Sequence, residues 1–338
     1  MHPIQSLFPL EGFLESRIGG RPENQDSCGF SDTPLGALII VCDGMGGMKG
    51  GSTASSLAVS TIIASFTSAS PEDEPETTIR RAISTANDVI IRTGMDNPDL
   101  QGMGTTVVLV LINKDCAYVA KVGDSRLYQL RDGKKRFRTF DDSMVFQLVK
   151  SGAITEEEAR TASNSNIITK ALGVANHVEC EVEKLDYDKN DRFLLCSDGY
   201  WGPLKEKDLI ALLTKKNRDL SMLFERSIDK VEDAAKTNRP DHYDNLTAII
   251  FDVKCNSKFR SKMERVFKIS TIVLAVLLLF SIGVIFFLLL QNKTQDQKNA
   301  EGSDSASVIT KTENLPKHDV VNADEVNAQE NDDNQEKK

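Results

Sequence analysis

The sequence predicts an α+β protein in which antiparallel sheets are flanked by helices, with one transmembrane helix in its C-terminal part. Stretches of strand character and stretches of helical character come in blocks, whereas a parallel sheet would require strict alternation of the two. Two β-rich runs are separated by a short turn at residues 113–115, which predicts an antiparallel hairpin. Residues 269–290 carry no charge over 22 positions, which is long enough to cross the hydrocarbon layer of a membrane.

The first well-bounded strand is the apolar, partly β-branched run at residues 35–42, which glycines stop just after Asp43. Residues 52–66 carry alanine, serine and leucine at helical spacing. The acidic residues and proline at 71–76 suit the start of a second helix at 75–93. The pattern further predicts strands at 105–112, 116–122, 127–130, 178–185, 192–197 and 246–253, and helices from 142, from 155, at 205–214 and at 218–237.

The composition argues against nucleic-acid binding and against a zinc site. The formal net charge is −9, and residues 301–338 alone hold ten acidic and four basic side chains, so the chain lacks the basic face that nucleic acid requires. The six cysteines have no C-x-x-C spacing, and the four histidines have no ligand spacing. We interpret the cysteines as reduced thiols, with Cys42 and Cys196 acting as small buried hydrophobic side chains.

The uncharged run at residues 269–290 predicts a single-pass membrane anchor, while the first eleven residues lack the features of a signal peptide. Six basic residues lie between positions 254 and 268, but only Lys293 and Lys298 follow the run closely. The positive-inside rule then places residues 1–268 in the cytoplasm and the tail outside. We expect residues 256–268 to be a basic juxtamembrane linker and residues 291–338 a disordered acidic tail, more simply a solvated extension than a sensor.

Aspartates recur where the predicted strands begin or end. The run before Asp43 and the run before Asp198 share one pattern, in which apolar residues lead to an aspartate and then a glycine. Each aspartate alone is explained by the preference of this residue for turns and strand exits. If the strands are neighbours, however, the carboxylates converge into an oxygen-only site suited to Mg²⁺ or Mn²⁺, and cations would relieve their mutual repulsion. The residues therefore predict a metal-dependent hydrolase. The five aspartates are Asp26, Asp43, Asp124, Asp198 and Asp244.

Six short motifs occur in an order that resembles a known family. They are Arg21-Pro-Glu-Asn-Gln-Asp26, Asp43-Gly-Met-Gly-Gly47, Gly104-Thr-Thr106, Gly123-Asp-Ser-Arg126, Ser197-Asp-Gly199 and Asp244-Asn-Leu-Thr247. This ordered set resembles the signature of the metal-dependent type-2C (PPM) serine/threonine protein phosphatases, in particular their bacterial branch. The resemblance covers about residues 14–253, and residues 142–178 resemble the flap lobe of that branch.

The resemblance implies an αββα sandwich within residues 1–255, with two Mn²⁺ or Mg²⁺ ions between two antiparallel sheets. It implies that Asp43 bridges both ions, that the Gly44 carbonyl binds one of them, and that Asp198 and Asp244 complete the coordination. Asp26 would act through a water molecule, and Asp124 with Asp198 would hold a third, looser ion.

It further implies that Arg21 grips the substrate phosphate with its planar guanidinium fork. A water shared by the two cations would then attack phosphorus in line, with no covalent enzyme intermediate.

The sequence departs from the family pattern at three places. Met48-Lys49 stands where many bacterial members carry a histidine that protonates the leaving group. Asp142 occupies the position of a usual histidine, and residues 238–243 replace a segment in which glycines are more usual. Our hypothesis is that a metal-bound water protonates the leaving group, with Lys49 and His242 as lesser candidates. A solvated side chain is the simpler interpretation of both.

Three readings of function remain open at this point. The leading one is an active phosphoserine/phosphothreonine phosphatase at the cytoplasmic face of a membrane, acting on phosphorylated proteins and opposing a serine/threonine kinase. The second is a non-catalytic pseudophosphatase that binds phosphoproteins or transmits a signal, which the missing histidine allows. The third shares the chemistry of the first but serves one dedicated anti-sigma antagonist.

Overall fold

The computed structural model describes residues 1–46, 50–162, 167–214, 219–257, 272–288 and 290. The chain divides into two compact units, Met1–Lys268 and Ile269–Lys338. The first unit holds every named strand and helix, and the candidate site lies within it.

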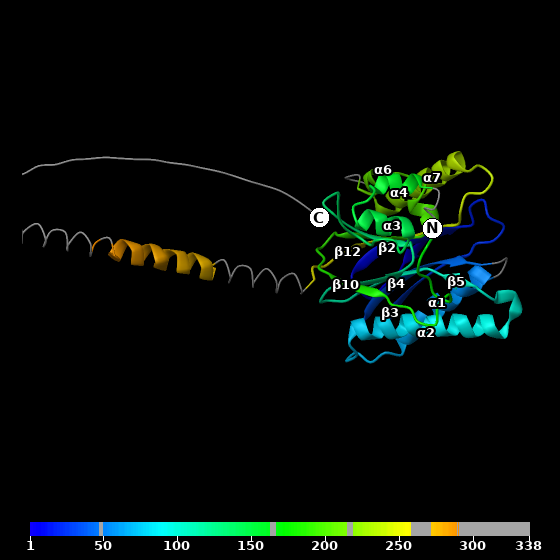
Figure 1. Ribbon diagram of the computed structural model, residues 1–338, viewed down its shortest axis with the longest axis horizontal. Coiled ribbons are helices and arrows are strands. Elements are labelled where there is room, and N and C mark those ends of the chain that lie inside the picture. The colour runs from blue at the N-terminus through cyan, green and yellow to red at the C-terminus, as the bar shows by residue number, and fades with distance from the viewer. Residues whose placement is uncertain (47–49, 163–166, 215–218, 258–271, 289, 291–338) are drawn as a thin grey trace, which may run out of the picture. The chain divides into compact units, whose positions relative to one another are not determined.

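Two antiparallel sheets form the middle of the first unit (Figure 1). One has the order β1 (His2–Ile4), β2 (Leu10–Arg17), β12 (Leu246–Val253), β11 (Arg192–Cys196), β8 (Arg126–Arg131) and β9 (Lys134–Arg138). The other has the order β10 (Glu181–Leu185), β7 (Ala117–Val122), β6 (Val107–Ile112), β4 (Gly36–Met45) and β3 (Asp26–Thr33), and β5 (Gly104–Thr105) pairs with β4. This arrangement confirms the predicted α+β class with antiparallel sheets.

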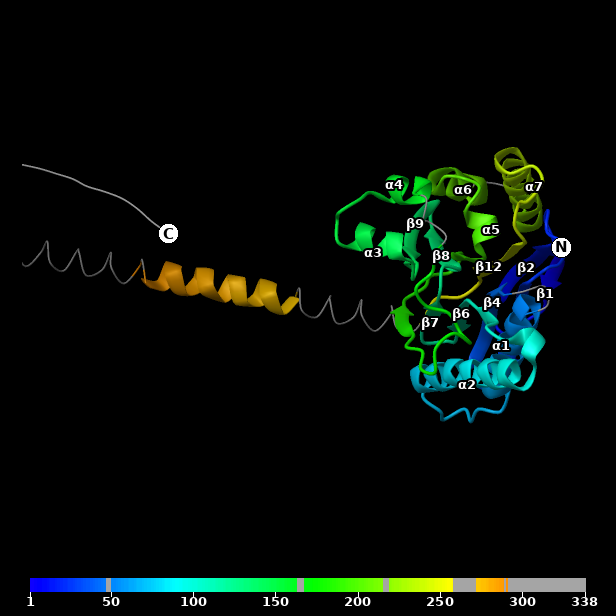
Figure 2. The same ribbon diagram turned by 45° about the vertical axis from the view of Figure 1, so that its right-hand side comes forward.

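Helices cover the outer face of each sheet (Figure 1). The long helices α1 (Gly50–Thr67) and α2 (Pro75–Asp96) pack on the sheet that contains β4, and the short η1 (Pro98–Leu100) follows α2. On the other side lie α5 (Asp198–Trp201), α6 (Glu206–Leu213) and α7 (Leu220–Asn238). The remaining helices, α3 (Met144–Lys150) and α4 (Glu156–Thr161), belong to the excursion between β9 and β10, and Figure 2 shows them beyond the edge of β8 and β9.

The alternation of side chains along each strand divides the core into three layers. In β4, Leu38, Ile40 and Cys42 face the helices α1 and α2, whereas Ala37, Ile39 and Val41 face the opposite sheet. In β11, Leu194 and Cys196 pack under α5–α7, while Phe193 and Leu195 join the layer between the sheets. Both Cys42 and Cys196 are fully buried, as the sequence indicated. A strand with apolar residues on both faces can only be stable between two such layers.

Four strands have no counterpart among the strand ranges predicted from the sequence, namely β1, β2, β3 and β9. Strand β2 carries the charged residues Glu11, Glu15 and Arg17, so its local pattern is weak. It is held instead by pairing along its whole length with β12, more than 200 residues further along the chain. Strand β9, with the sequence KKRFR, is an edge strand whose partner β8 carries the apolar residues. The predicted elements elsewhere are present, with ends shifted by a few residues.

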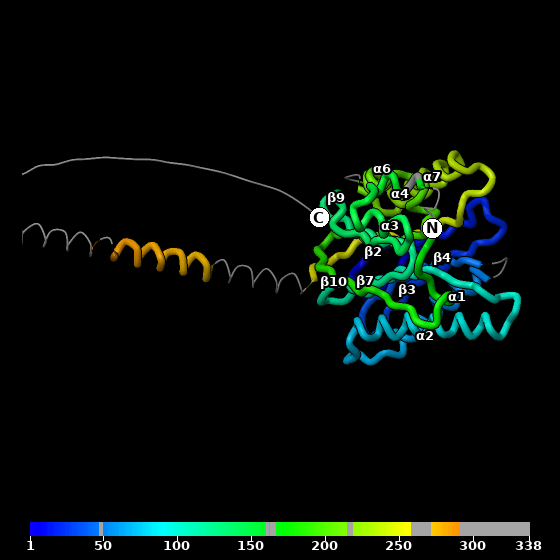
Figure 3. Tube along the Cα trace, viewed as in Figure 1, coloured from blue at the N-terminus to red at the C-terminus, as the bar shows by residue number. Residues whose placement is uncertain are grey.

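The segment after β9 leaves the first sheet and leads to β10 at the edge of the second sheet (Figure 3). It is held at its base by a bridge between Ser143 and Ile168, and by a bridge between Leu172 and Thr105 of β5. Further out, the buried Arg138 guanidinium donates to Glu156 at the start of α4 and to Glu206 at the start of α6. These contacts fix the described part of the predicted flap lobe, residues 142–178, against β5 beside the second sheet and against β9 of the first sheet.

In the second unit, residues 272–288 are helical and their large apolar side chains are exposed. Across the described ranges, no helix combines the length and the hydropathy needed to cross a membrane. Parts of the predicted anchor (269–271 and 289), most of the predicted linker (258–268) and the predicted tail (291–338) lie outside the described residues.

Candidate metal centre

Asp26 and Asp43 are direct partners in the pairing of β3 with β4. Asp43 follows Ile39 and Val41 at two-residue spacing, so it continues the face of β4 that looks toward the other sheet. Asp26 likewise precedes Cys28 and Phe30, which pack against the layer between the sheets. The two carboxylates therefore extend the inner face of one sheet beyond the end of its apolar core.

Asp198 and Asp244 come from the other sheet. Strands β11 and β12 are antiparallel neighbours with Cys196 opposite Ala248, so the end of one strand and the start of the next lie at the same edge. A Cβ on Gly199 would lie 1.9 Å from the Asn245 carbonyl oxygen, so only glycine allows the start of α5 to pack on this segment. The close approach brings Asp198 next to Asp244.

Hydrogen bonds across the two sheets fix the site. The Ser197 hydroxyl donates to Asp26 Oδ2 over 2.8 Å, and it also accepts from the Thr247 amide over 3.1 Å. On the first sheet, the Asp43 amide donates to the Thr106 hydroxyl over 2.9 Å, and the Asp43 carbonyl accepts from the Thr106 amide over 2.8 Å. The Gly104-Thr-Thr106 motif thus positions the backbone of Asp43, a role that its sequence did not indicate.

Gly44 follows Asp43 in a place that no other residue could occupy without a shift. A Cβ there would lie 2.0 Å from the Gly51 carbonyl oxygen, and the Gly44 amide donates to the Gln25 carbonyl over 3.1 Å. The backbone of β4 therefore runs close to the first turn of α1 and to the segment that leads into Asp26. Residues 47–49, which include Met48 and Lys49, lie outside the described residues.

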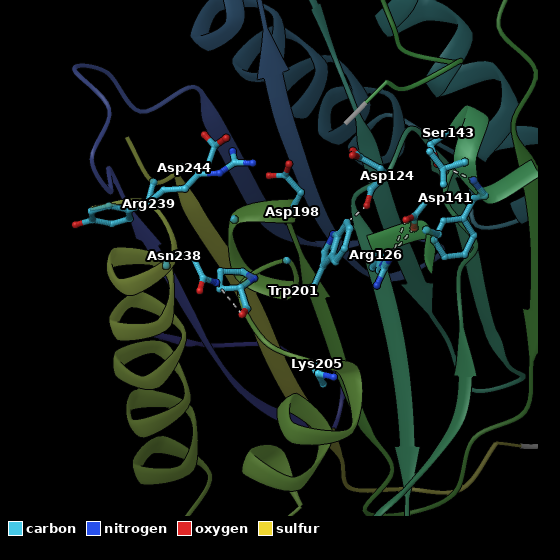
Figure 4. Close-up of a pocket in the computed structure, with 18 of the residues that line it drawn as sticks. Asp124, Arg126, Asp141, Ser143, Asp198, Trp201, Lys205, Asn238, Arg239 and Asp244 are labelled. Atoms are coloured by element: carbon cyan, nitrogen blue, oxygen red, sulfur yellow. Dashed lines mark hydrogen bonds and ion pairs between the residues drawn. The ribbon is translucent and has the colours of Figure 1, made fainter. Parts of the chain in front are cut away.

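The fifth aspartate, Asp124, lies in the turn between β7 and β8. Asp142, at the position where the family usually has histidine, accepts from the Gly123 amide over 3.0 Å and pairs with Lys121 over 2.7 Å. Trp201 Nε1 donates to the Asp124 carbonyl over 3.1 Å. Figure 4 shows Asp124 in the same cavity wall as Asp198 and Asp244. All five predicted aspartates are therefore brought to one end of the sandwich.

Burial and mutual repulsion raise the pKa of these carboxyl groups. Burial is the main cause at each, and neighbouring carboxylates add to it: the pKa of Asp198 rises to about 6, that of Asp26 to about 7 and that of Asp124 to about 8. The pKa of Asp43 is raised well above its usual range, with Asp26 and Asp198 as the strongest neighbours. Several acids that resist ionisation in one cleft are a high-energy arrangement, which bound cations would stabilise.

The donor chemistry of the site fits divalent cations such as Mg²⁺ or Mn²⁺. All five groups offer oxygen, the ligand atom that these ions prefer. Asp26 Oδ1 is buried and has no hydrogen-bond partner among the described residues, although a buried polar atom is normally paired. As the side chains stand, no set of three or more His, Cys, Asp or Glu residues within the described ranges is arranged to hold a metal ion.

Arg21 reaches the same end of the sandwich. Its Nη2 lies 2.7 Å from Asp244 Oδ2, and its side chain remains 47% exposed. The Gly20 amide donates to the Tyr243 carbonyl over 3.0 Å, which ties the loop before Arg21 to the residue before Asp244. The guanidinium is therefore beside the acidic cluster and accessible from solvent. His242 is exposed, and its side chain forms no hydrogen bond or ion pair with the cluster within the described part of the chain.

A buried arginine that sequence reasoning gave no role supports the Asp124 side of the site. Arg126 donates from Nε and Nη2 to the two oxygens of Asp141, over 2.8 and 2.7 Å, and both side chains are 4% exposed. Its guanidinium carbon lies 3.3 Å from the ring centroid of Trp201 and 5.4 Å from that of Phe146 in α3. Its place in the Gly123–Arg126 motif, next to Asp124, was the only signal for this role.

Comparison with known proteins agrees with this geometry. The family model described as protein phosphatase 2C matches residues 15–250. The chain belongs to the protein phosphatase 2C family. It is therefore an enzyme, a serine/threonine protein phosphatase, and the family suggested by its ordered motifs is confirmed.

Similar members of the 2C family come from several bacteria. The serine/threonine phosphatase stp of Listeria monocytogenes is 33% identical over 244 residues, which cover 71% of this chain and 94% of that protein. The crystal structure of the serine/threonine phosphatase Stp1 from Staphylococcus aureus matches with a TM-score of 0.66 and 29% identity, covering 75% of this chain and 98% of that one. The catalytic domain of the phosphatase PstP, solved in complex with two manganese ions, matches with a TM-score of 0.60 and 30% identity, covering 72% of this chain and 98% of that one.

Proposed function

We propose that this 2C-family phosphatase hydrolyses phosphoserine and phosphothreonine in proteins with the help of two Mn²⁺ or Mg²⁺ ions. Asp43, Asp198, Asp244 and the Gly44 carbonyl would hold the ions, and Asp26 would act through a water molecule. Asp124 together with Asp198 would hold a third ion. The observation that carries the proposal is the convergence of five carboxylates from both sheets, with one buried Asp26 oxygen left without a hydrogen bond.

The chemistry that the cations supply when bound is a nucleophilic water at neutral pH and compensation of the charge on the phosphate oxygens. The residues of the chain hold this arrangement in place. Thr106 fixes the backbone of Asp43, and the pair of Ser197 and Thr247 fixes the orientation of Asp26. Because Thr106 and Ser197 lie directly beside strand ends and Thr247 lies within β12, these hydrogen bonds hold the carboxylates close together, which preorganises the site for charge.

Arg21 would bind the substrate phosphate. It is half exposed beside the cluster and now pairs with Asp244, an interaction that a phosphate dianion could replace with two parallel hydrogen bonds. Protonation of the leaving serine or threonine oxygen has no obvious side-chain donor, because Met48 stands at the usual histidine position. We propose that a water molecule held at this acidic end of the sandwich would supply the proton.

We further propose that residues 269–290 anchor the enzyme, with the phosphatase unit in the cytoplasm and the acidic tail outside. The lack of charge across these residues and the six basic residues before them support this arrangement. Its substrates would then include targets of a serine/threonine kinase at the same membrane. Cell fractionation tests the anchor: the full chain should stay with membranes after alkaline carbonate and be released by detergent, and recovery in the carbonate wash would refute it.

The catalytic proposal is tested by turnover of p-nitrophenyl phosphate and of a phosphothreonine peptide by the full chain, with Mn²⁺ titrated from a chelated sample. We expect activity that depends on Mn²⁺ and is lost in Asp198→Asn and Asp43→Asn. Binding is followed separately by the rise in thermal midpoint with Mn²⁺. A wild-type chain that binds Mn²⁺ but turns over neither substrate would be a pseudophosphatase, and the catalytic proposal would be wrong.

A further inference from the structure

A cavity of about 480 Å³ lies beside the acidic cluster. Asp124, Asp198 and Asp244 line one side of it (Figure 4). The rest is lined by residues of α3, α4 and α5, by the segment between α5 and α6, by the end of α7 with the segment after it, and by Arg126. Its volume is in the range of sites that hold small ligands, and it is far larger than a phosphate group needs. The surplus space is therefore available to the part of the substrate that carries the phosphate.

Three basic residues line this cavity, and two of them are already paired. Arg126 is held by Asp141, and Lys205 Nζ lies 2.5 Å from Glu157 Oε1. The third, Arg239, is exposed and forms no ion pair within the described part of the chain. Its guanidinium is thus the basic group of the cavity wall that is available to a negatively charged ligand.

The backbone holds Arg239 at a fixed position. It ends α7, where its amide donates to the Ala235 carbonyl over 2.9 Å and its carbonyl accepts from the His242 amide over 3.4 Å. The preceding Asn238 donates from its side chain to the Pro203 carbonyl over 3.3 Å. In Figure 4 the Arg239 side chain extends toward Asp244 and Asp198. The residue therefore borders the place where the phosphorylated side chain would enter.

Arg239 belongs to residues 238–243, a segment that contains no glycine. A glycine-rich segment would offer only backbone amides here, whereas an arginine offers five N–H donors in a planar fork. A donor of this kind on the cavity wall suits the selection of an anionic substrate.

We propose that Arg239 selects substrates that carry an anionic side chain close to the phosphorylated residue. The class of substrate is an acidic phosphopeptide, in which a carboxylate or a second phosphate forms hydrogen bonds with the guanidinium. This inference rests on the proposed function, because it assigns the substrate class of the same site. The other two basic residues of the cavity wall, Arg126 and Lys205, are already in ion pairs. The contact with Arg239 therefore decides the preference.

The test uses the full chain and a set of phosphothreonine peptides of one sequence. In each peptide one of the two positions on either side of the phosphothreonine carries glutamine, glutamate or phosphoserine. We expect wild type to favour glutamate over glutamine at one of these positions by about fivefold in kcat/KM, mostly through KM, which is the upper range for a partly exposed ion pair. If Arg239 binds a doubly charged group better than a carboxylate, the peptide with phosphoserine at that position should exceed the glutamine peptide in kcat/KM by a larger factor than the glutamate peptide does.

The preference should vanish in Arg239→Gln and persist in part in Arg239→Lys. Arg226→Gln is the matched control, because Arg226 is exposed on the same helix but does not line the cavity. Equal kcat/KM for glutamate and glutamine peptides in wild type, or an unchanged preference in Arg239→Gln, would overturn the assignment of Arg239 alone. Absence of turnover on every peptide and on p-nitrophenyl phosphate would overturn the proposed function and this inference together.

Discussion

Replacing Arg126 with methionine should destabilise the phosphatase unit more than any exposed substitution. The change removes one partner of an ion pair in which Arg126 and Asp141 are both 4% exposed, and it leaves the Asp141 carboxylate buried without its two hydrogen bonds. Methionine keeps much of the apolar contact with Trp201 and Phe146, so the loss reports mainly on charge. The change also weakens the stack that holds Trp201 against the Asp124 carbonyl.

The expected magnitude follows from the burial of the pair. Breaking a buried ion pair by removing one partner costs about 3–5 kcal/mol, because the remaining charge is uncompensated. The stacking of the guanidinium on Trp201, with 3.3 Å from its carbon to the ring centroid, adds about 1 kcal/mol. With a slope of about 2 kcal/mol per molar urea, the unfolding midpoint should fall by about 2–3 M.

Urea unfolding followed by Trp201 fluorescence and by circular dichroism measures this change. Arg136→Met is the matched control, because Arg136 lies exposed on the neighbouring strand β9 and should shift stability by less than about 0.5 kcal/mol. The double variant Arg126→Met with Asp141→Leu removes both charges and should recover most of the loss. A single variant within about 1 kcal/mol of wild type, or a double variant no more stable than the single one, would refute the reasoning.

Four further outcomes are expected. Gly199→Ala places a Cβ 1.9 Å from the Asn245 carbonyl oxygen and should cost at least about 2 kcal/mol in urea unfolding; a neutral effect would mean that the strand ends are free to separate. In chelated protein the raised pKa values of Asp198 (about 6), Asp26 (about 7) and Asp124 (about 8) mean that the folded state binds more protons than the unfolded one, so the thermal midpoint should fall as pH rises from 5 to 8; a rising midpoint would contradict this sign. Saturation with Mn²⁺ at about 100 times its Kd should add about 2.7 kcal/mol of stability at neutral pH, and Asp43→Asn should abolish that gain in a thermal scan. Met48→His should raise turnover of an alkyl phosphate and alter its pH–rate profile, whereas no change in either would show that a side-chain acid at this position is dispensable.

The strands that form the middle of each sheet were predictable because their apolar runs are local signals. Residues 107–112 and 246–253 are buried on both faces, and their patterns predicted strands without any knowledge of neighbours. Strand β2 was not predictable in this way, since its charges hide the pattern and its partner is β12, at the other end of the unit. Local sequence carries no information about such a pairing.

In the candidate site, too, the local sequence predicted some features, whereas others depend on contacts between distant parts of the chain. Each aspartate could be found from its place beside a strand, but their convergence depends on β3 pairing with β4 and on β11 pairing with β12. The supporting contacts were not predictable, because Ser197 reaches Asp26 across 171 residues of sequence. The role of Asp142 was not predictable either, because the sequence showed only its departure from the family pattern. In the structure Asp142 pairs with Lys121 and accepts from the Gly123 amide, and it so supports the turn that carries Asp124.

The position of β12 has a consequence for how the protein is made. It is the last strand among the described residues of the unit, but it lies between β2 and β11 inside the first sheet. During synthesis the N-terminal hairpin of β1 and β2 has therefore no place in that sheet until residues 246–253 leave the ribosome, and Asp244 arrives only just before them. A chain interrupted at residue 240 would expose the edges of both β2 and β11, which favours aggregation. Phosphatase activity is thus withheld from every chain that has not yet reached β12, and the addition of this one strand completes both the first sheet and the acidic cluster.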